Sequence, residues 1–381
     1  MLINKPYPFF GALDSLRGIA ALTVVIFHVA WVHPLASWGI IQNGNLMVDF
    51  FFVLSGFVIY HAYQDKIKSW GSLRSFVFLR LARLYPIHFL FLLVFLGIEL
   101  IKYIAETQFG ITASNPAFSN NNFYSFTSNL FLTHSLHLHD TPTFNLPSWS
   151  ISTEFYTYLL FAIVMLVTRT TTLFLLATTS LILISIFLLA HFGQAGLDAS
   201  VSYGYFRCVA GFFIGALTYR IYLILPKQIS DKDENTFSRS ALAIGLILGI
   251  AIFSTERITG LYQFILLPGF ALMILFIVTT PNSSVHSFLN LPPLLWLGKI
   301  SYSIYMSHSA VLWFYNQALK LVINAPLIIP NEDTQLIFRP PPFIGILFVC
   351  LAVGTTLIVS HFTYKLIENP LRRKSREFVN R

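Results

Sequence analysis

Arg17 and His28 are two ionisable residues in one long apolar segment, RGIAALTVVIFH. In a helix of 3.6 residues per turn, residues eleven apart share one face and lie about 16 Å apart along the axis. An ionisable side chain inside a membrane is costly unless it is paired or hydrated, so both are functional candidates. His28 is a candidate general base, and Arg17 could hold an anion at the inner boundary. Packing of His28 against a neighbouring helix is the structural alternative.

Glu154, in the sequence SWSISTEFYTY, is a candidate partner for His28. It comes about seven residues after Pro147, where we expect its segment to begin, and is therefore roughly 10 Å deep. His28 lies at a similar depth below the outer end of its own segment. A carboxylate that orients an imidazole and stabilises its protonated form makes the imidazole a competent general base toward a hydroxyl. A structural ion pair between two helices would use the same residues.

Arg80 and Arg83, in LRLARLYP, are three residues apart and share one helix face. Planar guanidinium groups bind phosphate with two parallel hydrogen bonds, so a phosphate-rich donor such as a coenzyme A thioester would fit them. The inner side of a membrane also attracts basic residues of any kind, and that anchoring explains the same pair equally well.

Asp49 and Arg207 are charged residues in or near other apolar segments. Asp49, in MVDFFFVLSGF, needs a partner, which either a buried link between helices or a substrate would supply. Arg207 is expected near the outer face, where it could pair with Glu154 or extend outward to water.

Ser55, Tyr305 and His308 are further polar candidates. Ser55 precedes Gly56, and this pair of small residues indicates close helix packing. Tyr305 and His308, in SYSIYMSH, are expected near the middle of the membrane. There they could join two helices or support a substrate.

His134, His137 and His139 have spacings that could bind a metal ion, but the sequence places no acidic or thiol partner set beside them. We therefore expect surface histidines and no metal centre. Cys208 and Cys350 fall in different parts of the chain and are expected to be free thiols.

The elements that position these residues follow from composition. Of the 381 residues, 55% are hydrophobic and only 10% are charged, whereas soluble domains carry about 25% charged residues. The apolar residues form runs long enough to cross a bilayer, which takes about 20 residues of helix. Ten or eleven helices are predicted, the ten candidates being 16–32, 46–63, 84–104, 149–168, 171–191, 203–223, 240–255, 261–280, 300–319 and 343–366.

Each of these runs must be a helix, because lipid cannot hydrogen-bond the backbone. The runs are continuously apolar and do not alternate, which excludes a membrane β-barrel. The stretch 126–138 is too short to cross and is expected to be a partial or re-entrant segment. The predicted fold class is therefore an all-α, polytopic transmembrane helix bundle.

The net charge of +8 is explained by membrane orientation, without nucleic-acid binding. If ten helices cross and the N-terminus is cytoplasmic, 19 of the 24 Lys and Arg residues fall on the inner side. The first apolar run contains Arg17 and has no clean cleavage site, so we expect it to remain as a helix. Both termini are then cytoplasmic. The outer side holds the other five basic residues: Lys102, Arg207, Arg257, Lys320 and Arg339.

A single membrane domain is expected over 1–381, with its core at about 10–373. The outer loop 103–148 is rich in Asn, Ser, Thr and His and could line an entrance for a polar substrate. The C-terminal residues 374–381 form a basic cytoplasmic tail, and the chain from Asn369 onward is expected to lie against anionic membrane lipids.

Seven motifs taken in order resemble the acyltransferase 3 family of membrane-bound acyltransferases. They run from about Phe10 to Arg373 and read RGIAALTVVIFH, VDFFFVLSGF, LRLARLYP, SWSISTEFYTY, FRCVAGFFIG, LGKISYSIYMSH and IENPLRR. The resemblance implies about ten helices and an enzyme that acylates carbohydrates or related extracytoplasmic molecules, usually from acetyl-CoA. The family's recognisable motifs map onto Arg17 and His28, onto Arg80 and Arg83, and onto Trp149, Ser150 and Glu154.

Some members of that family carry a C-terminal esterase-like domain, and this sequence ends after its last helix. The membrane domain would then act alone or with a separate extracytoplasmic partner. The predicted reaction moves an acyl group from cytoplasmic acyl-CoA to a hydroxyl of a glycan or glycolipid. Two alternatives are a purely structural scaffold and a proton-coupled transporter or flippase. The transporter would relay protons through His28, Glu154 and His308, but the two halves of the sequence show no repeat of the kind many transporters have.

Overall fold

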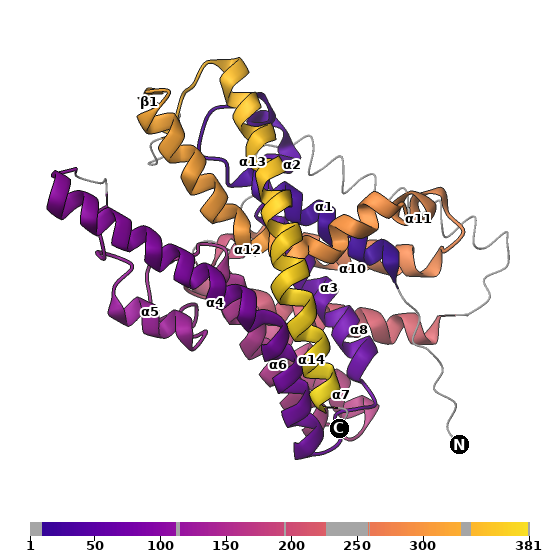
Figure 1. Ribbon diagram of the computed structural model, residues 1–381. Coiled ribbons are helices and arrows are strands. Elements are labelled where there is room, and N and C mark those ends of the chain that lie inside the picture. The colour runs from indigo at the N-terminus through magenta and orange to yellow at the C-terminus, as the bar shows by residue number, and fades with distance from the viewer. Residues whose placement is uncertain are drawn as a thin grey trace.

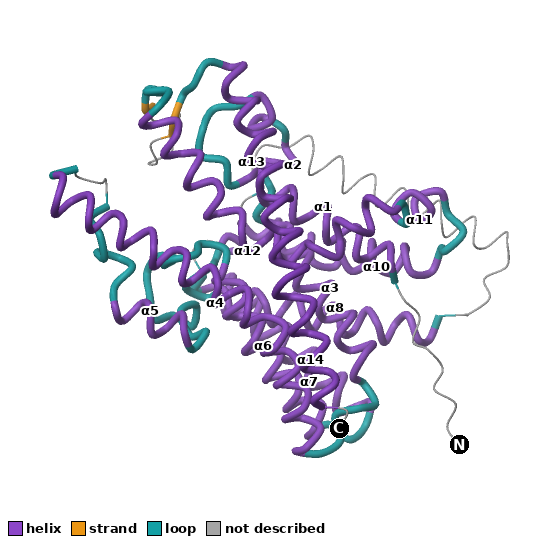
Figure 2. Tube along the Cα trace, viewed as in Figure 1, coloured by secondary structure: helices purple, strands orange, loops and turns teal. Residues whose placement is uncertain are grey.

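The computed structural model describes residues 10–111, 115–193, 196–225, 258, 260–328 and 337–379. In these residues the protein is almost entirely helical (Figures 1 and 2). The exception is a two-stranded antiparallel ribbon of β1 (Leu327–Ile328) and β2 (Ile337–Phe338) at one end of the molecule. The prediction of an all-α fold is confirmed for this part of the chain.

Seven helices in the described residues are long and apolar enough to cross a membrane. They are α3 (Leu46–Tyr63), α4 (Trp70–Phe109), α6 (Ser148–Val167), α7 (Thr171–His191), α8 (Gly204–Ile224), the continuous helix Gly260–Thr279 that contains α10 (Leu266–Thr279), and the helix Pro342–Val379 that contains α13 and α14.

Two further helices overlap predicted spans but have other ends, which corrects the predicted bounds 16–32 and 300–319. These are α1 (Gly11–Phe27), of 17 residues, and α12 (Pro292–Leu321), of 30 residues. The predicted span 240–255 lies outside the described residues. The polytopic architecture is thus confirmed, whereas the count of ten stays a prediction.

Helix α4 corrects two predicted boundaries. It runs for 40 residues without interruption, from Trp70, well before the predicted span 84–104, to Phe109, inside the predicted outer loop 103–148. At 1.5 Å per residue it is about 60 Å long, twice the thickness of a hydrocarbon core. Ser69 and Ser72 form a capping box that fixes its start, and Gly110, in the left-handed conformation, ends it. Arg80 and Arg83 therefore lie on one helix, as predicted from their spacing.

The predicted re-entrant segment 126–138 contains only one short helix, α5 (Phe123–Leu130). The polypeptide before it is fastened to α4 through Glu99. This carboxylate accepts hydrogen bonds from the backbone N–H of Phe118 at 2.8 Å and from the Asn121 amide at 3.0 Å. The outer loop is thereby held against the end of the long helix.

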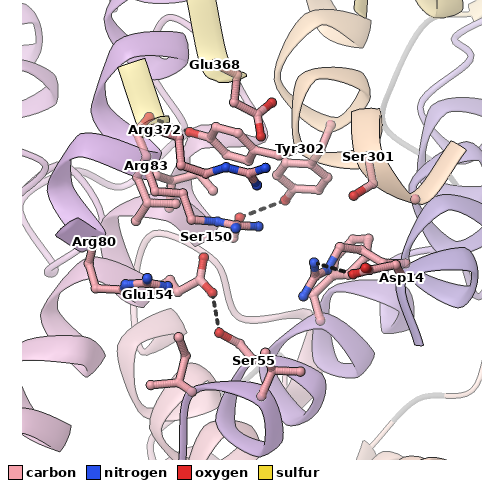
Figure 3. A pocket seen from close by; sticks show the side chains of 18 of the residues that line it. Asp14, Ser55, Arg80, Arg83, Ser150, Glu154, Ser301, Tyr302, Glu368 and Arg372 are labelled. Atoms are coloured by element: carbon pink, nitrogen blue, oxygen red, sulfur yellow. Dashed lines mark hydrogen bonds and ion pairs between the residues drawn. The ribbon is translucent and has the colours of Figure 1, made fainter. Parts of the chain in front are cut away.

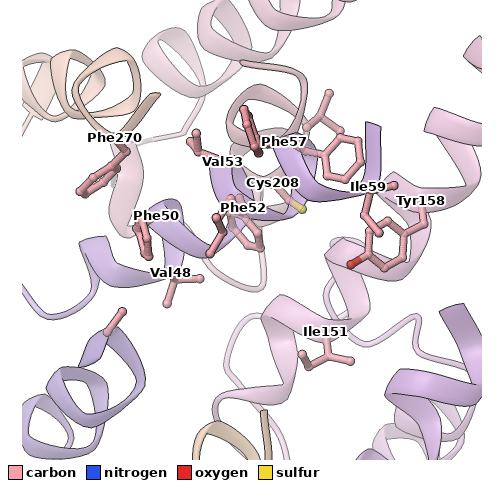
Figure 4. Packing of buried hydrophobic residues seen from close by; sticks show 14 of the residues in the cluster. Val48, Phe50, Phe52, Val53, Phe57, Ile59, Ile151, Tyr158, Cys208 and Phe270 are labelled. Atoms are coloured by element: carbon pink, nitrogen blue, oxygen red, sulfur yellow. The ribbon is translucent and has the colours of Figure 1, made fainter. Parts of the chain in front are cut away.

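Helices α3 and α8 pack with their backbones in contact. A Cβ added to Gly56 would lie 1.7 Å from the carbonyl oxygen of Phe212, and one added to Gly215 would lie 1.8 Å from that of Val53. Only glycine allows this approach. Aromatic residues of α3 fill the space around the contact, as Figure 4 shows for Phe52 and others beside Cys208 of α8.

Helices α1 and α12 make a second contact of the same kind. A Cβ on Gly18 would lie 2.8 Å from the backbone nitrogen of Gly298, and a Cβ on Gly298 would lie 2.3 Å from the carbonyl oxygen of Asp14. The two helices are therefore locked in one register at this point.

The C-terminal part of the chain is a continuous helix (the yellow column in Figure 1) rather than a free tail. α13 (Pro342–Thr363) passes through a π-helical turn, Tyr364–Glu368, into α14 (Asn369–Val379). α14 packs on α4, where the ring of Phe378 lies 5.6 Å from that of Phe78. The expectation that this segment simply lies on lipid is corrected, because one face of α14 is covered by protein.

Candidate active site

A cavity of about 570 Å³ lies among α1, α3, α4, α6, α12 and the C-terminal helix. Its walls carry an unusual number of charged groups for a site inside a helix bundle. Figure 3 shows Arg80, Arg83 and Arg372 on one side, near Glu154 and Glu368, with Asp14 on the other. The charged residues that line it are Asp14, Arg17, Arg80, Arg83, Glu154, Lys299, Glu368, Arg372 and Arg376.

Arg17, Arg80 and Arg83 line this cavity together, although they come from two helices. Arg17 is paired with Asp14 at 3.3 Å. Arg80 donates a hydrogen bond to the hydroxyl of Tyr63 at 3.2 Å and lies 5.3 Å from the centre of that ring. The structure thus brings the predicted phosphate-binding arginines to one place.

Several lining residues were missed by the sequence analysis. Lys299, Glu368, Arg372 and Arg376 were assigned to membrane anchoring or not singled out, yet all four face the cavity. For three of them the sequence did carry a signal. Glu368, Arg372 and Arg376 follow one another at intervals of four and so share a helix face.

Glu154 lines the cavity and is held by two hydroxyl groups. It accepts hydrogen bonds from Ser55 at 2.7 Å and from Tyr158 at 2.6 Å, with the same carboxylate oxygen. The Ser55 and Tyr158 hydroxyls are also 2.9 Å apart. Ser55 is therefore part of the cavity wall, while its neighbour Gly56 supplies the close packing that was predicted.

Ser150 and Tyr305 form another part of the cavity wall. Their hydroxyl groups are 2.8 Å apart, and both residues line the cavity. Trp149 points elsewhere: its ring packs against Phe52 at 6.1 Å and lies 5.1 Å from the guanidinium carbon of Arg207. Trp149 is a packing residue, whereas Ser150 belongs to the cavity.

His28 contacts His308, and the predicted contact with Glu154 is wrong. His28 is the residue that ends α1. Its Nδ1 lies 3.3 Å from Nε2 of His308 and 2.9 Å from the carbonyl oxygen of Val24. Within the described residues, His28 is not among those that line the cavity, and the printed partners of Glu154 are Ser55 and Tyr158.

The register of α1 and α12 explains this pairing. His28 follows Gly18 by ten residues, and His308 follows Gly298 by ten. Because Gly18 meets Gly298 and the helices run in the same direction from that contact, residues at equal distances along them meet as well. Similar depth in the membrane was therefore insufficient to select Glu154 as the partner.

The hydrogen bonds of the two histidines assign their tautomers. A carbonyl oxygen only accepts, so Nδ1 of His28 carries the proton that it donates to Val24. Nδ1 of His308 likewise donates to the carbonyl of Tyr305 at 2.7 Å, which leaves its Nε2 free to accept from His28. Neutral His28 then has an unprotonated Nε2, the form that a general base requires.

Tyr305 connects the histidine pair to the cavity. Its ring lines the cavity and its centre lies 5.9 Å from that of His308, while its carbonyl holds the ring of His308. The histidine pair thus lies directly behind one wall of the cavity. A cation-lined chamber next to an imidazole with a free nitrogen is suited to acyl transfer from a phosphate-bearing donor.

Comparison with known proteins agrees with this geometry. The sequence profile of the acyltransferase domain family, acyltransferase 3, matches residues 10–364. The chain belongs to this acyltransferase family. It is therefore a multi-pass membrane protein, as its helices indicate.

Its relatives include proteins named as O-acetyltransferases. A putative peptidoglycan O-acetyltransferase of Bacillus subtilis, YrhL, is 26% identical over 99% of this chain and 57% of its own length. The O-acetyltransferase OatA of Staphylococcus aureus is 26% identical over 96% of this chain and 58% of its own. The chain thus spans less than three-fifths of the length of these relatives.

Asp49 and Arg207 form a buried ion pair away from the cavity. Arg207 donates to the two carboxylate oxygens of Asp49 at 2.8 and 2.6 Å, and also to the carbonyls of Ala199 and Asn45. The predicted link of Asp49 between helices is confirmed, since it joins α3 to α8. The suggested pairing of Arg207 with Glu154 is wrong, because Asp49 occupies the guanidinium group.

One of the three loop histidines corrects another expectation, whereas His137 is exposed as expected. His134 is 3% exposed, stacks on His88 at 5.7 Å and lies 3.1 Å from the Ser148 hydroxyl, so it is not a surface residue. Burial, with a smaller contribution from His88, lowers the pKa of His134 to about 3; burial also lowers the pKa of His139. Among the described residues no cluster suits a metal ion. The prediction that Cys208 and Cys350 are free thiols is confirmed.

Proposed function

We propose that this protein moves an acetyl or other acyl group from acyl-CoA at the cytoplasmic face to a hydroxyl of an extracytoplasmic or lipid-linked polysaccharide. The observation that carries the proposal is the cation-lined cavity, one of whose lining residues, Tyr305, contacts His308 of the His28–His308 pair. The names of the relatives support a glycan such as peptidoglycan as acceptor and acetyl as the group transferred.

The orientation of the chain supports this direction of transfer. The arginines of the cavity, including Arg17, Arg80 and Arg83, all belong to segments that the distribution of basic residues assigns to the inner side. His28 ends α1 and Ser150 lies near the start of α6, at the helix ends that this orientation assigns to the outer side, while Tyr305 lies near the middle of α12. A donor whose phosphates are held from the cytoplasm could therefore extend its acyl end toward the histidines.

The reaction would proceed by general base catalysis. Nε2 of His28 accepts the proton of the acceptor hydroxyl while that oxygen forms a bond to the thioester carbonyl carbon. The carbon–sulfur bond then breaks, and the coenzyme A sulfur leaves as the thiol after taking the proton back from His28. Nε2 of His308 accepts the hydrogen bond from Nδ1 of His28 throughout and stabilises the transient imidazolium, the role first assigned to Glu154.

The alternative of a proton-coupled transporter required a relay through His28, Glu154 and His308. His28 and His308 are in contact, but Glu154 is bonded to Ser55 and Tyr158 in the cavity. The relay therefore lacks its acidic member, and the acyltransferase proposal uses the observed contacts better.

The test is replacement of His28 by Ala in purified protein reconstituted into vesicles. We expect acyl transfer from acetyl-CoA to fall by about 10²- to 10⁴-fold, the usual contribution of a general base. Release of coenzyme A thiol and the mass of the glycan product measure the reaction, and a gain of one acetyl group identifies the transferred unit. Full activity of a well-folded His28→Ala protein would remove the mechanism.

A further inference from the structure

The C-terminal helix carries a feature that the reaction above does not use. We propose that Arg372 and Arg376 of α14 bind phosphate groups of the acyl donor, so that this helix forms part of the donor site. The inference rests on the proposed function for the identity of the donor. It assigns a binding role to a segment that the sequence alone associated with lipid.

One face of the C-terminal helix lines the cavity from Tyr364 to Arg376. Tyr364, Glu368, Arg372 and Arg376 are four residues apart, and each of them lines it. In a regular α-helix such a series drifts by about 40° at every step, because four residues exceed one turn of 3.6. The π-helical turn Tyr364–Glu368 is wider than an α turn and opposes this drift. Turns of this kind are frequent at functional sites.

The helix is held in place by contacts within and after its π turn. Glu368 is buried and accepts a hydrogen bond from Ser303 of α12 at 2.8 Å. Further along, Ser375 is buried and Phe378 packs on Phe78 of α4. The two arginines therefore project from a fixed helix, and Arg372 is shown beside Arg83 and Glu368 in Figure 3.

The cavity has more cationic than anionic side chains, which favours an anionic ligand. Six cations from α1, α4, α12 and α14 face three carboxylates: Asp14, Glu154 and Glu368. Cationic groups that are withdrawn from water without partners are costly, and guanidinium groups bind phosphate in particular. A coenzyme A thioester, which carries a diphosphate and a further phosphate, has the charge that this excess requires. An anionic lipid headgroup offers the same phosphate chemistry from another source.

The same helix provides a matched control. Arg373 is the neighbour of Arg372, but its side chain is 79% exposed and lies 3.7 Å from Glu377 on the outer face of α14. It is not among the residues lining the cavity in the described part of the chain. Replacing Arg373 removes the same charge from the same helix without touching the cavity.

The experiment compares Arg372→Ala/Arg376→Ala with Arg373→Ala in purified full-length protein. Binding of coenzyme A is measured by calorimetry, and KM is measured for acetyl-CoA and for acetyl-pantetheine, which has no phosphate groups. We expect the double variant to weaken coenzyme A binding and raise the KM for acetyl-CoA by roughly 10- to 100-fold, the range for losing charged hydrogen bonds. The KM for acetyl-pantetheine and all constants of Arg373→Ala should stay unchanged.

The outcomes separate the two proposals. If the wild-type protein binds no coenzyme A, the proposed function fails and this inference fails with it. If the wild type binds coenzyme A and the double variant binds it equally well, only the inference about α14 is overturned. Activity that depends on vesicles containing an anionic lipid, and loses this dependence in the double variant at unchanged KM, would instead assign the arginines to a lipid headgroup.

A folding defect in the double variant is detected by its elution in size-exclusion chromatography and is avoided with Arg372→Gln/Arg376→Gln. This variant keeps side chains of similar length but removes both charges. The same loss of coenzyme A affinity is expected from it, and retention of wild-type affinity would equally overturn the inference.

Discussion

At the scale of single residues, the partner of His28 determines what the site can do. An imidazole acts as a general base only while one of its nitrogens is unprotonated. The carbonyl of Val24 and Nε2 of His308 both face Nδ1 of His28, which directs the lone pair to Nε2. The imidazole of His308 thus orients that of His28, a role that a carboxylate fills in the Ser-His-Asp triad.

Replacement of His308 tests this orientation. We expect His308→Ala to lower kcat by roughly 10- to 100-fold, because the imidazolium of His28 loses a hydrogen-bond acceptor worth about 1.5–3 kcal/mol. KM for acetyl-CoA should change little, since His308 is not among the described residues lining the cavity. His308→Gln, whose amide oxygen can accept the same bond, should retain more activity than His308→Ala. A rise in KM with kcat unchanged would contradict the assignment and point to a role in binding.

The sequence allowed part of this site to be predicted. Arg17, Arg80 and Arg83 were expected near one donor and do line one cavity, because basic residues at the same end of neighbouring helices converge. The partner of His28 could not be derived, since depth along a helix says nothing about which helix lies beside it. Only the contact of Gly18 with Gly298 selects His308, and a single sequence does not show that these two glycines meet.

At the scale of elements, the site depends on helices that approach more closely than side chains permit. The glycine contacts of α3 with α8 and of α1 with α12 bring backbone to backbone, and the second contact sets the register of the histidines. In membranes such packing replaces the hydrophobic effect as the source of helix association. The sequence predicted the helices themselves, from their apolar runs, but their pairing is decided by these few small residues.

Replacing Gly215 by Ala tests the contact of α3 with α8. The new methyl group would be placed 1.8 Å from the carbonyl oxygen of Val53, so the helices must separate and lose their packing. We expect a destabilisation of at least about 1–3 kcal/mol, the usual range for overpacking, visible as a lower thermal midpoint in detergent.

Gly97→Ala is the matched control for this prediction. Gly97 lies inside helix α4, and a Cβ placed on it meets no atom of the described residues within 4 Å. Since alanine favours the helix over glycine by up to about 1 kcal/mol, this variant should be as stable as the wild type or more so. Equal effects of the two substitutions would show that the packing at Gly215 does not limit stability.

At the scale of the whole molecule, the buried polar residues form separate clusters, and each cluster has its own role. The cavity collects cations at the predicted cytoplasmic end, the Asp49–Arg207 pair ties α3 to α8, and the outer loop buries histidines against α4 and α6. Composition predicted the membrane bundle and the charge distribution predicted its orientation. The inward face of α14 could not be foreseen, because a basic C-terminal segment has the same composition whether it contacts lipid or a ligand.

The buried loop histidine makes the stability of the whole bundle depend on pH. Burial holds the pKa of His134 at about 3, well below its ordinary value of 6.5, so the folded protein keeps this residue neutral while the unfolded chain takes up a proton below about pH 6.5. The unfolded state then binds more protons, and stability falls as the pH falls through 6.5. For this one group, going from pH 7 to pH 5 costs about 2 kcal/mol.

His134→Gln separates this residue from the others that titrate in the same range. Gln can still hydrogen-bond the hydroxyl of Ser148, which now lies 3.1 Å from Nε2 of His134, but it takes up no proton. Thermal midpoints in detergent at pH 7 and pH 5 should therefore differ less for the variant than for the wild type, even if the variant is less stable at both. His139, whose pKa is also lowered, contributes equally to both proteins and cancels from the comparison. If the midpoint changes equally with pH in the two proteins, His134 is protonated as easily in the folded loop as in the unfolded chain. That result would contradict the prediction, which rests on the burial of His134 against His88.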